Sequence, residues 1–132
     1  IHEDAANKVR NALMAVVLKG GTGTKAQVDG FHVAGKTGTA YKPREPRNRG
    51  YHTGRYVVSF MGFLPAENPR LAGIIVVDDP QNEGFRYGGH VAAPIFSKIA
   101  AAAMPYMGIE PRKATRSLGP SSEQVLQGNL ID

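Results

Sequence analysis

A short run of residues, Lys36-Thr37-Gly38-Thr39, has the types and the order to hold a carboxylate and to polarise a carbonyl group. Lys36 supplies a positive charge, and the hydroxyls of Thr37 and Thr39 can donate hydrogen bonds to an anionic oxygen. Gly38 has no side chain, so a ligand can lie against the backbone there. On an edge strand, the free N–H groups of the run can also bind an extended peptide or act as oxyanion-hole donors. The alternative is a solvated lysine beside two strand-forming residues and a turn glycine.

The run lies within a segment, Phe31–Ala40, that alternates in the manner of a strand and is interrupted by glycines. A glycine inside a strand often marks a place where a ligand or a second backbone comes close, which favours the binding role. Two further strands are predicted downstream. Residues 56–63 are rich in strong β-formers. Residues 71–77 are almost continuously apolar, which is typical of a central strand buried on both faces.

Two helices are predicted to flank these strands. The first covers residues 5–19, with Asp4 as its N-cap and Gly20-Gly21 as its stop. The second covers residues 91–104, with Pro94 in its first turn. Apolar residues recur on one side of the first helix at Val9, Leu13, Val16 and Val17, and of the second at Val91, Ile95 and Ile99. We expect the stripe of the first helix to pack in the core.

The connections between the strands, residues 41–55 and 65–69, are too short to hold crossover helices. We therefore predict an α+β fold, with an antiparallel sheet flanked by helices that pack on one face. Residues 1–104 are expected to form this unit. Residues 105–132 have little periodicity and are rich in Pro, Gly and Ser, so we expect a mobile C-terminal tail.

Composition narrows the classes of function. The 132 residues carry a formal net charge of +5 and no cysteine, which excludes disulfides, thiolate metal sites and a cysteine nucleophile. The histidines have no ligand spacing, so neither a metal nor a cofactor is expected. No targeting segment is visible, and no apolar run approaches the ~20 residues of a membrane span. The chain begins at Ile1, almost directly in a helical pattern, so we expect a soluble fragment of a longer protein.

A second candidate site is the loop Tyr41–Tyr56, which holds most of the net charge. It interleaves tyrosines with five basic residues, Lys42, Arg44, Arg47, Arg49 and Arg55, against one acidic residue, Glu45. Basic residues with aromatics can bind single-stranded nucleic acid or another anionic polymer. The simpler interpretation is a solvated loop, which we favour, and we expect no nucleic-acid partner.

Several stretches together resemble the class B penicillin-binding proteins. The string Val33–Ala40 is similar to the Lys-Thr-Gly motif of that family, which also has Ser-x-x-Lys and Ser-x-Asn motifs. Three other stretches match in order, namely Gly21–Ala26, Ser59–Pro65 and Tyr87–Phe96. The match covers about residues 5–104 and implies the C-terminal portion of a β-lactamase/transpeptidase-like fold. The Tyr87-Gly88-Gly89 stretch, with Asp78-Asp79-Pro80, resembles the septal cell-division (FtsI-like) branch.

The resemblance implies roles for individual residues. Lys36 would orient the substrate carboxylate and link to the serine of the second motif. Thr37 and Thr39 would bind that carboxylate, from a stem peptide or a β-lactam, and the backbone N–H of Thr39 would be an oxyanion-hole donor. Arg86 and Tyr87 would lie at the rim of the site.

The chain contains no Ser-x-x-Lys and no Ser-x-Asn. In the family both motifs precede the Lys-Thr-Gly strand, so the resemblance implies a parent protein with these motifs and a fragment that is inactive alone. The implied parent is a serine D,D-transpeptidase that crosslinks peptidoglycan and is inhibited by β-lactams. Its implied setting is the periplasmic side of a bacterial inner membrane, with division proteins as partners and an N-terminal anchor. A non-catalytic module that binds nucleic acid or wall polymer through Tyr41–Tyr56 remains the alternative.

Overall fold

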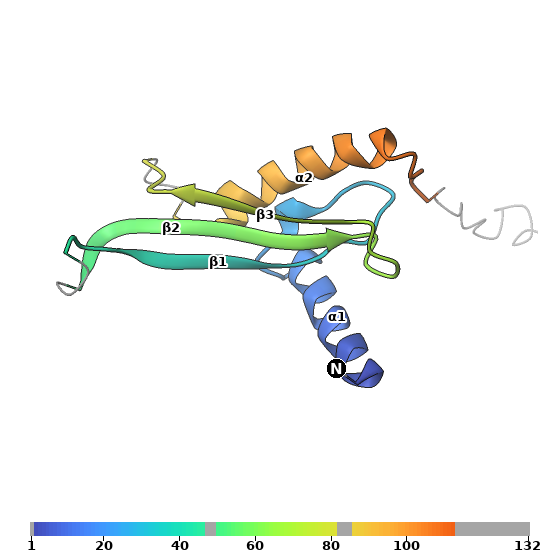
Figure 1. Ribbon diagram of the computed structural model, residues 1–132, viewed down its shortest axis with the longest axis horizontal. Coiled ribbons are helices and arrows are strands. Elements are labelled where there is room, and N and C mark those ends of the chain that lie inside the picture. Colours follow the sequence, from blue (N-terminus) through green and yellow to red (C-terminus); the bar gives the residue numbers. More distant parts are fainter. Residues whose placement is uncertain (1, 47–49, 82–85, 113–132) are drawn as a thin grey trace, which may run out of the picture.

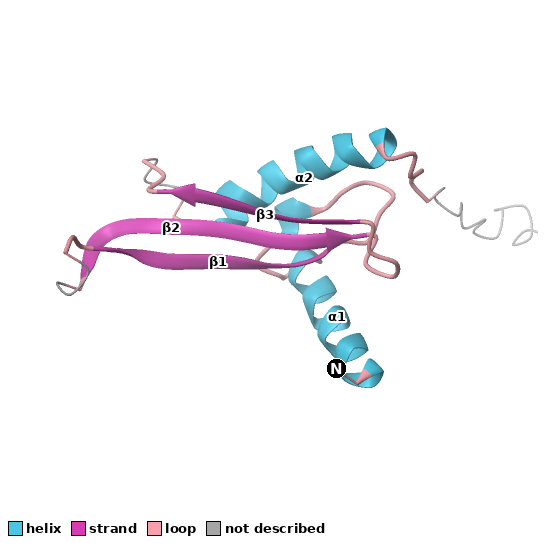
Figure 2. Cartoon of the chain, viewed as in Figure 1, coloured by secondary structure: helices cyan, strands magenta, loops and turns pink. Residues whose placement is uncertain are grey.

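The structure is a computed structural model that describes residues 2–46, 50–81 and 86–112. Its elements are α1 (Glu3–Val17), the short 3-10 helix η1 (Thr24–Ala26), β1 (Ala34–Pro43), β2 (Tyr51–Leu64), β3 (Leu71–Asp78) and α2 (Gly88–Tyr106). The strands form an antiparallel sheet in the order β1-β2-β3, and α2 lies across one face (Figures 1 and 2). The predicted α+β fold with an antiparallel sheet is confirmed.

The core lies between α2 and one face of the sheet, here called the covered face. Phe60 of β2 is fully buried, and its ring lies 5.0 Å from the ring of Phe96 on α2. Its strand partners in the register are Thr37 of β1 and Ile75 of β3, which lie on the same face. Alternate residues of all three strands therefore point toward α2.

The opposite face of the sheet, here called the open face, has no cover among the described residues. Met61 and Ile74 are each 59% exposed, and Val76 is 57% exposed. The prediction that residues 71–77 form a central strand buried on both faces is therefore wrong for this chain. β3 is one of the two edge strands of the sheet, and only its alternate residues reach the core.

α1 departs from its prediction in a similar way. It begins at Glu3 after His2, which takes the N-cap position expected for Asp4, and it ends at Val17. Only Val17 is buried, and it joins the same core cluster as α2, whereas Val9 is more than half exposed. The rest of α1 extends away from the sheet (Figure 1). The expectations that its whole stripe packs in the core and that both helices pack on one face hold only for its last turn.

The β1–β2 hairpin is longer than predicted. Residues 41–43 and 51–55 of the expected loop are strand, because Tyr41 pairs with Tyr56 and Pro43 pairs with Tyr51. The pairing is irregular between Tyr41 and Pro43. Tyrosine and threonine favour strands, and Pro43 is tolerated because it ends β1. The hairpin reaches beyond the end of β3 (Figure 1), and we call residues 41–46 and 50–56 the arm.

α2 also exceeds its predicted bounds. It runs from Gly88 to Tyr106, so Pro94 lies in its second turn and the boundary expected at residue 104 falls within the helix. Beyond it, Ile109 packs against the core. Residues 113–132 of the predicted tail lie outside the described residues. No helix in the described ranges has both the length and the apolar character to cross a bilayer.

The segment after α2 contacts one end of the sheet, and the arm lies at the other end. The backbone N–H of Arg112 donates to Gly30 O at 3.0 Å, and its guanidinium pairs with Glu67 at 2.6 Å. His32 contacts the same carboxylate. Although burial raises the pKa of Glu67, the hydrogen bonds from Arg112, its own backbone and His32 lower it to about 2. This cluster connects the segment after α2 to the loop before β1 and to the turn between β2 and β3.

Candidate active-site cleft

A cleft of about 330 Å³ forms where β1, the loop before it and the first turn of α2 meet. It is lined by Gly21, Thr22, Thr24, Lys25, Thr37, Thr39, Tyr87, Gly88, Gly89 and His90. Lys25 is the one lysine among these residues, and no carboxylate is present. A cleft lined by hydroxyl groups and a lysine, without an acidic side chain, suits an anionic or polar ligand.

Alternation along β1 divides the predicted motif between two faces. Thr37 and Thr39 lie on the covered face and line the cleft. Lys36 and Gly38 alternate with them and do not line it. Lys36 is exposed, and its Nζ donates a hydrogen bond to Thr37 O at 2.9 Å. In the described residues β1 pairs only with β2, so its other edge is available for an extended ligand.

Thr22, in the loop before β1, contacts the strand that carries the Lys36-Thr37-Gly38-Thr39 run. Its Oγ1 lies 3.0 Å from Oγ1 of Thr37, a hydrogen bond between residues 15 apart in the sequence. Four residues that line the cleft were not among the predicted site residues, namely Thr22, Thr24, Lys25 and His90. The sequence signals for them were the Gly21–Ala26 string, which holds the first three, and the Tyr87–Phe96 stretch, which holds His90. Neither string predicts the contact with Thr37, because that contact depends on the tertiary fold.

A glycine pair allows the helix to begin against the strands. A Cβ at Gly88 would lie 2.1 Å from Ser59 O, and a Cβ at Gly89 would lie 2.0 Å from Thr22 O. Both obstacles are backbone oxygens that no rotamer change can remove. The absence of side chains at these positions therefore brings Tyr87, the N-cap residue of α2, to the edge of the cleft beside Thr37 and Thr39. Arg86, the other predicted rim residue, is exposed next to it.

The arm separates its tyrosines from its basic residues. The rings of Tyr41 and Tyr56 lie 5.0 Å apart, and those of Tyr41 and Tyr51 lie 6.4 Å apart. Lys42 and Arg55, which adjoin Tyr41 and Tyr56 in the sequence, lie on the other side of the arm. Lys42 Nζ lies 2.6 Å from an oxygen of Asp78, and Arg55 Nε lies 2.7 Å from an oxygen of Asp79.

These ion pairs count against the alternative in which the loop Tyr41–Tyr56 binds nucleic acid or wall polymer. The hydrogen bond from Arg55 lowers the pKa of Asp79, which favours the charged form of that carboxylate. Two of the five predicted cations are thus neutralised by the end of β3, and Arg47 and Arg49 lie outside the described residues. The arrangement weakens the case for a cationic surface on this part of the chain.

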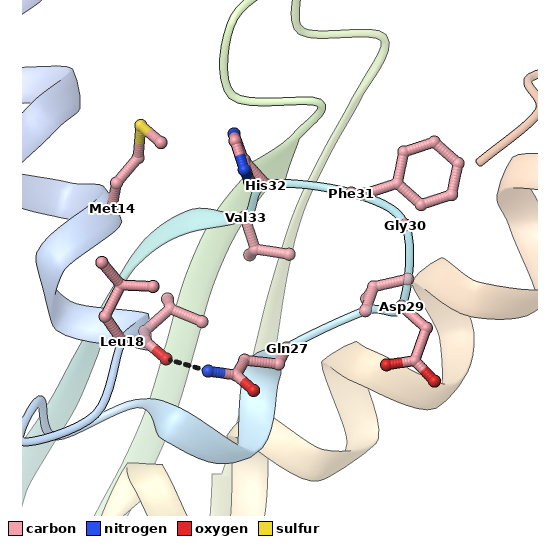
Figure 3. A pocket seen from close by; sticks show the side chains of 10 residues that line it. Met14, Leu18, Gln27, Asp29, Gly30, Phe31, His32 and Val33 are labelled. Atoms are coloured by element: carbon pink, nitrogen blue, oxygen red, sulfur yellow. Dashed lines mark hydrogen bonds between the residues drawn. The ribbon is translucent and has the colours of Figure 1, made fainter. Parts of the chain in front are cut away.

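A second cavity, of about 190 Å³, lies between α1 and the loop before β1 (Figure 3). Met14, Leu18 and Phe31 are among its apolar lining residues, and the Gln27 side chain donates to Val17 O at 2.9 Å beside it. None of the predicted site residues lines it. Within the described ranges, no group of three or more His, Asp or Glu side chains is placed to hold a metal ion.

Residues 1–101 match the penicillin binding protein transpeptidase domain family. The chain belongs to this family. Among its curated relatives, the probable peptidoglycan D,D-transpeptidase PenA of Neisseria gonorrhoeae is 44% identical over 111 residues, 84% of this chain. The peptidoglycan D,D-transpeptidase FtsI of Escherichia coli is 38% identical over 113 residues, 86% of this chain. The chain spans only 18% of the length of each of these two relatives.

Solved transpeptidases share the fold as well as the sequence. The apo transpeptidase domain of Burkholderia pseudomallei penicillin-binding protein 3 superposes with a TM-score of 0.71 at 38% identity, covering 83% of this chain and 32% of that one. Penicillin-binding protein 3 of Mycobacterium tuberculosis, complexed with ampicillin, gives 0.68 at 34% identity, covering 86% of this chain and 26% of that one. The sheet and α2 are therefore one portion of a transpeptidase domain.

Proposed function

We propose that this chain is the substrate-strand portion of a serine-type peptidoglycan D,D-transpeptidase. The observation that carries the proposal is the position of the Lys36-Thr37-Gly38-Thr39 run, on a strand whose threonines line a cleft beside the start of α2. Family membership supplies the reaction class, since relatives are named as peptidoglycan D,D-transpeptidases. The substrates are stem peptides of peptidoglycan, and β-lactams are inhibitors that occupy the same cleft.

Each residue of the run has a role in this proposal. The hydroxyls of Thr37 and Thr39 bind the terminal carboxylate of the stem peptide or its counterpart in a β-lactam. The backbone N–H of Thr39 donates to the oxyanion that forms when the scissile carbonyl is attacked. Lys36, on the other side of the strand, orients the carboxylate through its charge and links to the serine of the second motif. Arg86 and Tyr87 border the entrance.

The nucleophile comes from outside this sequence, which contains no Ser-x-x-Lys. A serine activated by its neighbouring lysine attacks the peptide carbonyl and releases the terminal residue, and the amine of a second stem peptide then takes the acyl group. This chain alone is therefore inactive. We place the parent protein, as part of the same proposal, at the periplasmic side of a bacterial inner membrane, in the septal division branch with division proteins as partners. The relative named FtsI supports the branch.

Labelling with benzylpenicillin tests the proposal. The parent protein is expected to gain one penicilloyl adduct on a serine outside these 132 residues, while this chain alone gains none. Lys36→Ala in the parent is expected to slow acylation at least about tenfold with little change in thermal stability, because an exposed lysine contributes little to folding. Intact mass and peptide mapping give both results. A label on this chain alone, or an unlabelled parent, would contradict the proposal.

A further inference from the structure

The tyrosines of the arm continue the face that forms the cleft. Thr37 and Thr39 pair with Phe60 and Val58, and the next residue of β1 on that face, Tyr41, pairs with Tyr56. The Tyr51 ring lies against Tyr41 farther along the arm. A single strip of aromatic rings therefore starts about 7 Å from Thr39, two residues along the strand, and extends away from the cleft.

The strip is exposed and uncharged. Tyr41 is 56% and Tyr51 66% exposed, and Tyr56, whose ring lies against Tyr41, is partly buried. The neighbouring cations Lys42 and Arg55 are held on the other side of the arm by Asp78 and Asp79. Exposed aromatic rings grouped on one side of a hairpin are an unusual use of apolar surface unless something covers them. A neutral ligand with a flat apolar side suits them better than an anionic polymer does.

We infer that Tyr41 and Tyr51 form a subsite for a pyranose ring of the glycan strand that carries the stem peptide. This inference rests on the proposed function. A pyranose has a flat side of C–H groups that packs on an aromatic ring, and its hydroxyls can bond to the phenolic O–H groups of tyrosine. Tyrosine also gives a large, rigid contact surface at a low cost in side-chain entropy.

The length of the strip fits this occupant. Tyr51 pairs with Pro43, four residues along β1 from Thr39, which corresponds to about 13 Å of strand. A stem peptide whose terminal carboxylate lies at Thr39, extended along β1 toward the arm, covers a similar distance in four residues. Its sugar-bearing end then arrives at Tyr51, so one continuous face accommodates both parts of the substrate.

The test compares two substrates of the full-length protein, a stem peptide alone and the same peptide on an N-acetylglucosamine–N-acetylmuramic acid oligosaccharide. Tyr41→Ala and Tyr51→Ala are expected to raise KM for the glycan-bearing substrate about tenfold, with kcat unchanged, and to change KM for the peptide alone by less than about twofold. Tyr51→Phe retains the ring, and its KM for the glycan-bearing substrate is expected to stay within about threefold of that of the unmodified full-length protein. Tyr106→Ala, at the 94% exposed far end of α2, is the matched control and is expected to change neither value.

An equal rise in KM for both substrates would show that the strip binds peptide or supports the arm, and would overturn the inference. An unchanged KM for both substrates would also overturn it. The proposed function is judged separately, by acylation of the unmodified protein with benzylpenicillin. If that acylation fails, calorimetric titration with the peptide-free oligosaccharide still decides the inference. Binding that weakens about tenfold in Tyr51→Ala supports the subsite, and binding that is absent or unaffected refutes it.

Discussion

The two faces of the sheet carry similar side chains in opposite environments. On the covered face Phe60 and Val58 are fully buried, whereas on the open face Met61 and Ile74 are each 59% exposed. Phe60 and Met61 are sequence neighbours, so the difference arises from what lies over the strand and not from the strand itself. Large apolar residues on an uncovered face indicate surface that another segment is meant to cover.

The sharpest way to test this comparison is to truncate the two neighbouring side chains. Phe60→Ala removes a fully buried ring that contacts Phe96 and is expected to destabilise this chain by about 3–5 kcal/mol, or to leave it unfolded. Met61→Ala is the matched control and is expected to change the free energy of unfolding by less than about 1 kcal/mol. Chemical denaturation of both variants gives the values, and equal losses would mean that the open face is also packed.

The contact between the covered face and the start of α2 is tested by adding a single methyl group. Gly89→Ala places a Cβ against Thr22 O and is expected to destabilise the chain by about 1–3 kcal/mol. It also moves Tyr87 away from Thr37, so acylation of the parent protein is expected to slow. Gly73→Ala is the control, because its Cβ meets only Phe96 at an ordinary 3.7 Å. Thermal unfolding and penicillin acylation measure the two effects, and a Gly89→Ala variant as stable as the control would contradict the close packing.

The open face predicts association of the isolated chain. With Met61, Ile74 and Val76 exposed on a three-stranded sheet, we expect this chain to self-associate at micromolar concentration. Ile74→Ser with Val76→Ser is expected to restore a monomer while changing the free energy of unfolding by less than about 1 kcal/mol. Sedimentation velocity distinguishes the species. A monomeric unmodified chain would show that the open face is tolerated without a cover.

The smallest expected effect is a dependence of stability on pH. It comes from the cluster of Glu67, His32 and Arg112, which belongs to neither face of the sheet. The folded-state pKa of Glu67, about 2, lies below its ordinary value of 4.5. The carboxylate therefore stabilises the fold above about pH 4.5, and this contribution is lost as the pH falls toward 2. Because the side chain is 44% exposed, we expect less than about 1 kcal/mol. Glu67→Gln should remove this component from unfolding curves measured between these pH values, and an unchanged pH profile would refute it.

The sequence was sufficient to predict the order of the elements, the antiparallel sheet and the strand that carries Lys36-Thr37-Gly38-Thr39. It was not sufficient for features that depend on distant neighbours. A continuous apolar run such as residues 71–77 indicates that both faces prefer burial, but not whether a cover is present. Thr22 contacts Thr37 only because the loop folds back on β1.

The arm shows a different limit. The two prolines and several charges of residues 41–55 suggested a loop, yet cross-strand pairing of Tyr41 with Tyr56 outweighs these local signals. The same pairing sorts tyrosines and cations onto opposite sides, which a linear sequence presents as interleaved. Composition therefore indicated one mixed surface where the structure has two.

The junction of Arg112 with Gly30 and Glu67 has a practical consequence for engineering. α2 has 19 residues, so its end lies about 28 Å from its start at the cleft. Because Arg112 is anchored beyond that end, a fluorophore or fusion partner joined directly after it would start remote from the substrate entrance. The same anchoring makes Arg112 a suitable fixed reference point for distance measurements to a label on the arm.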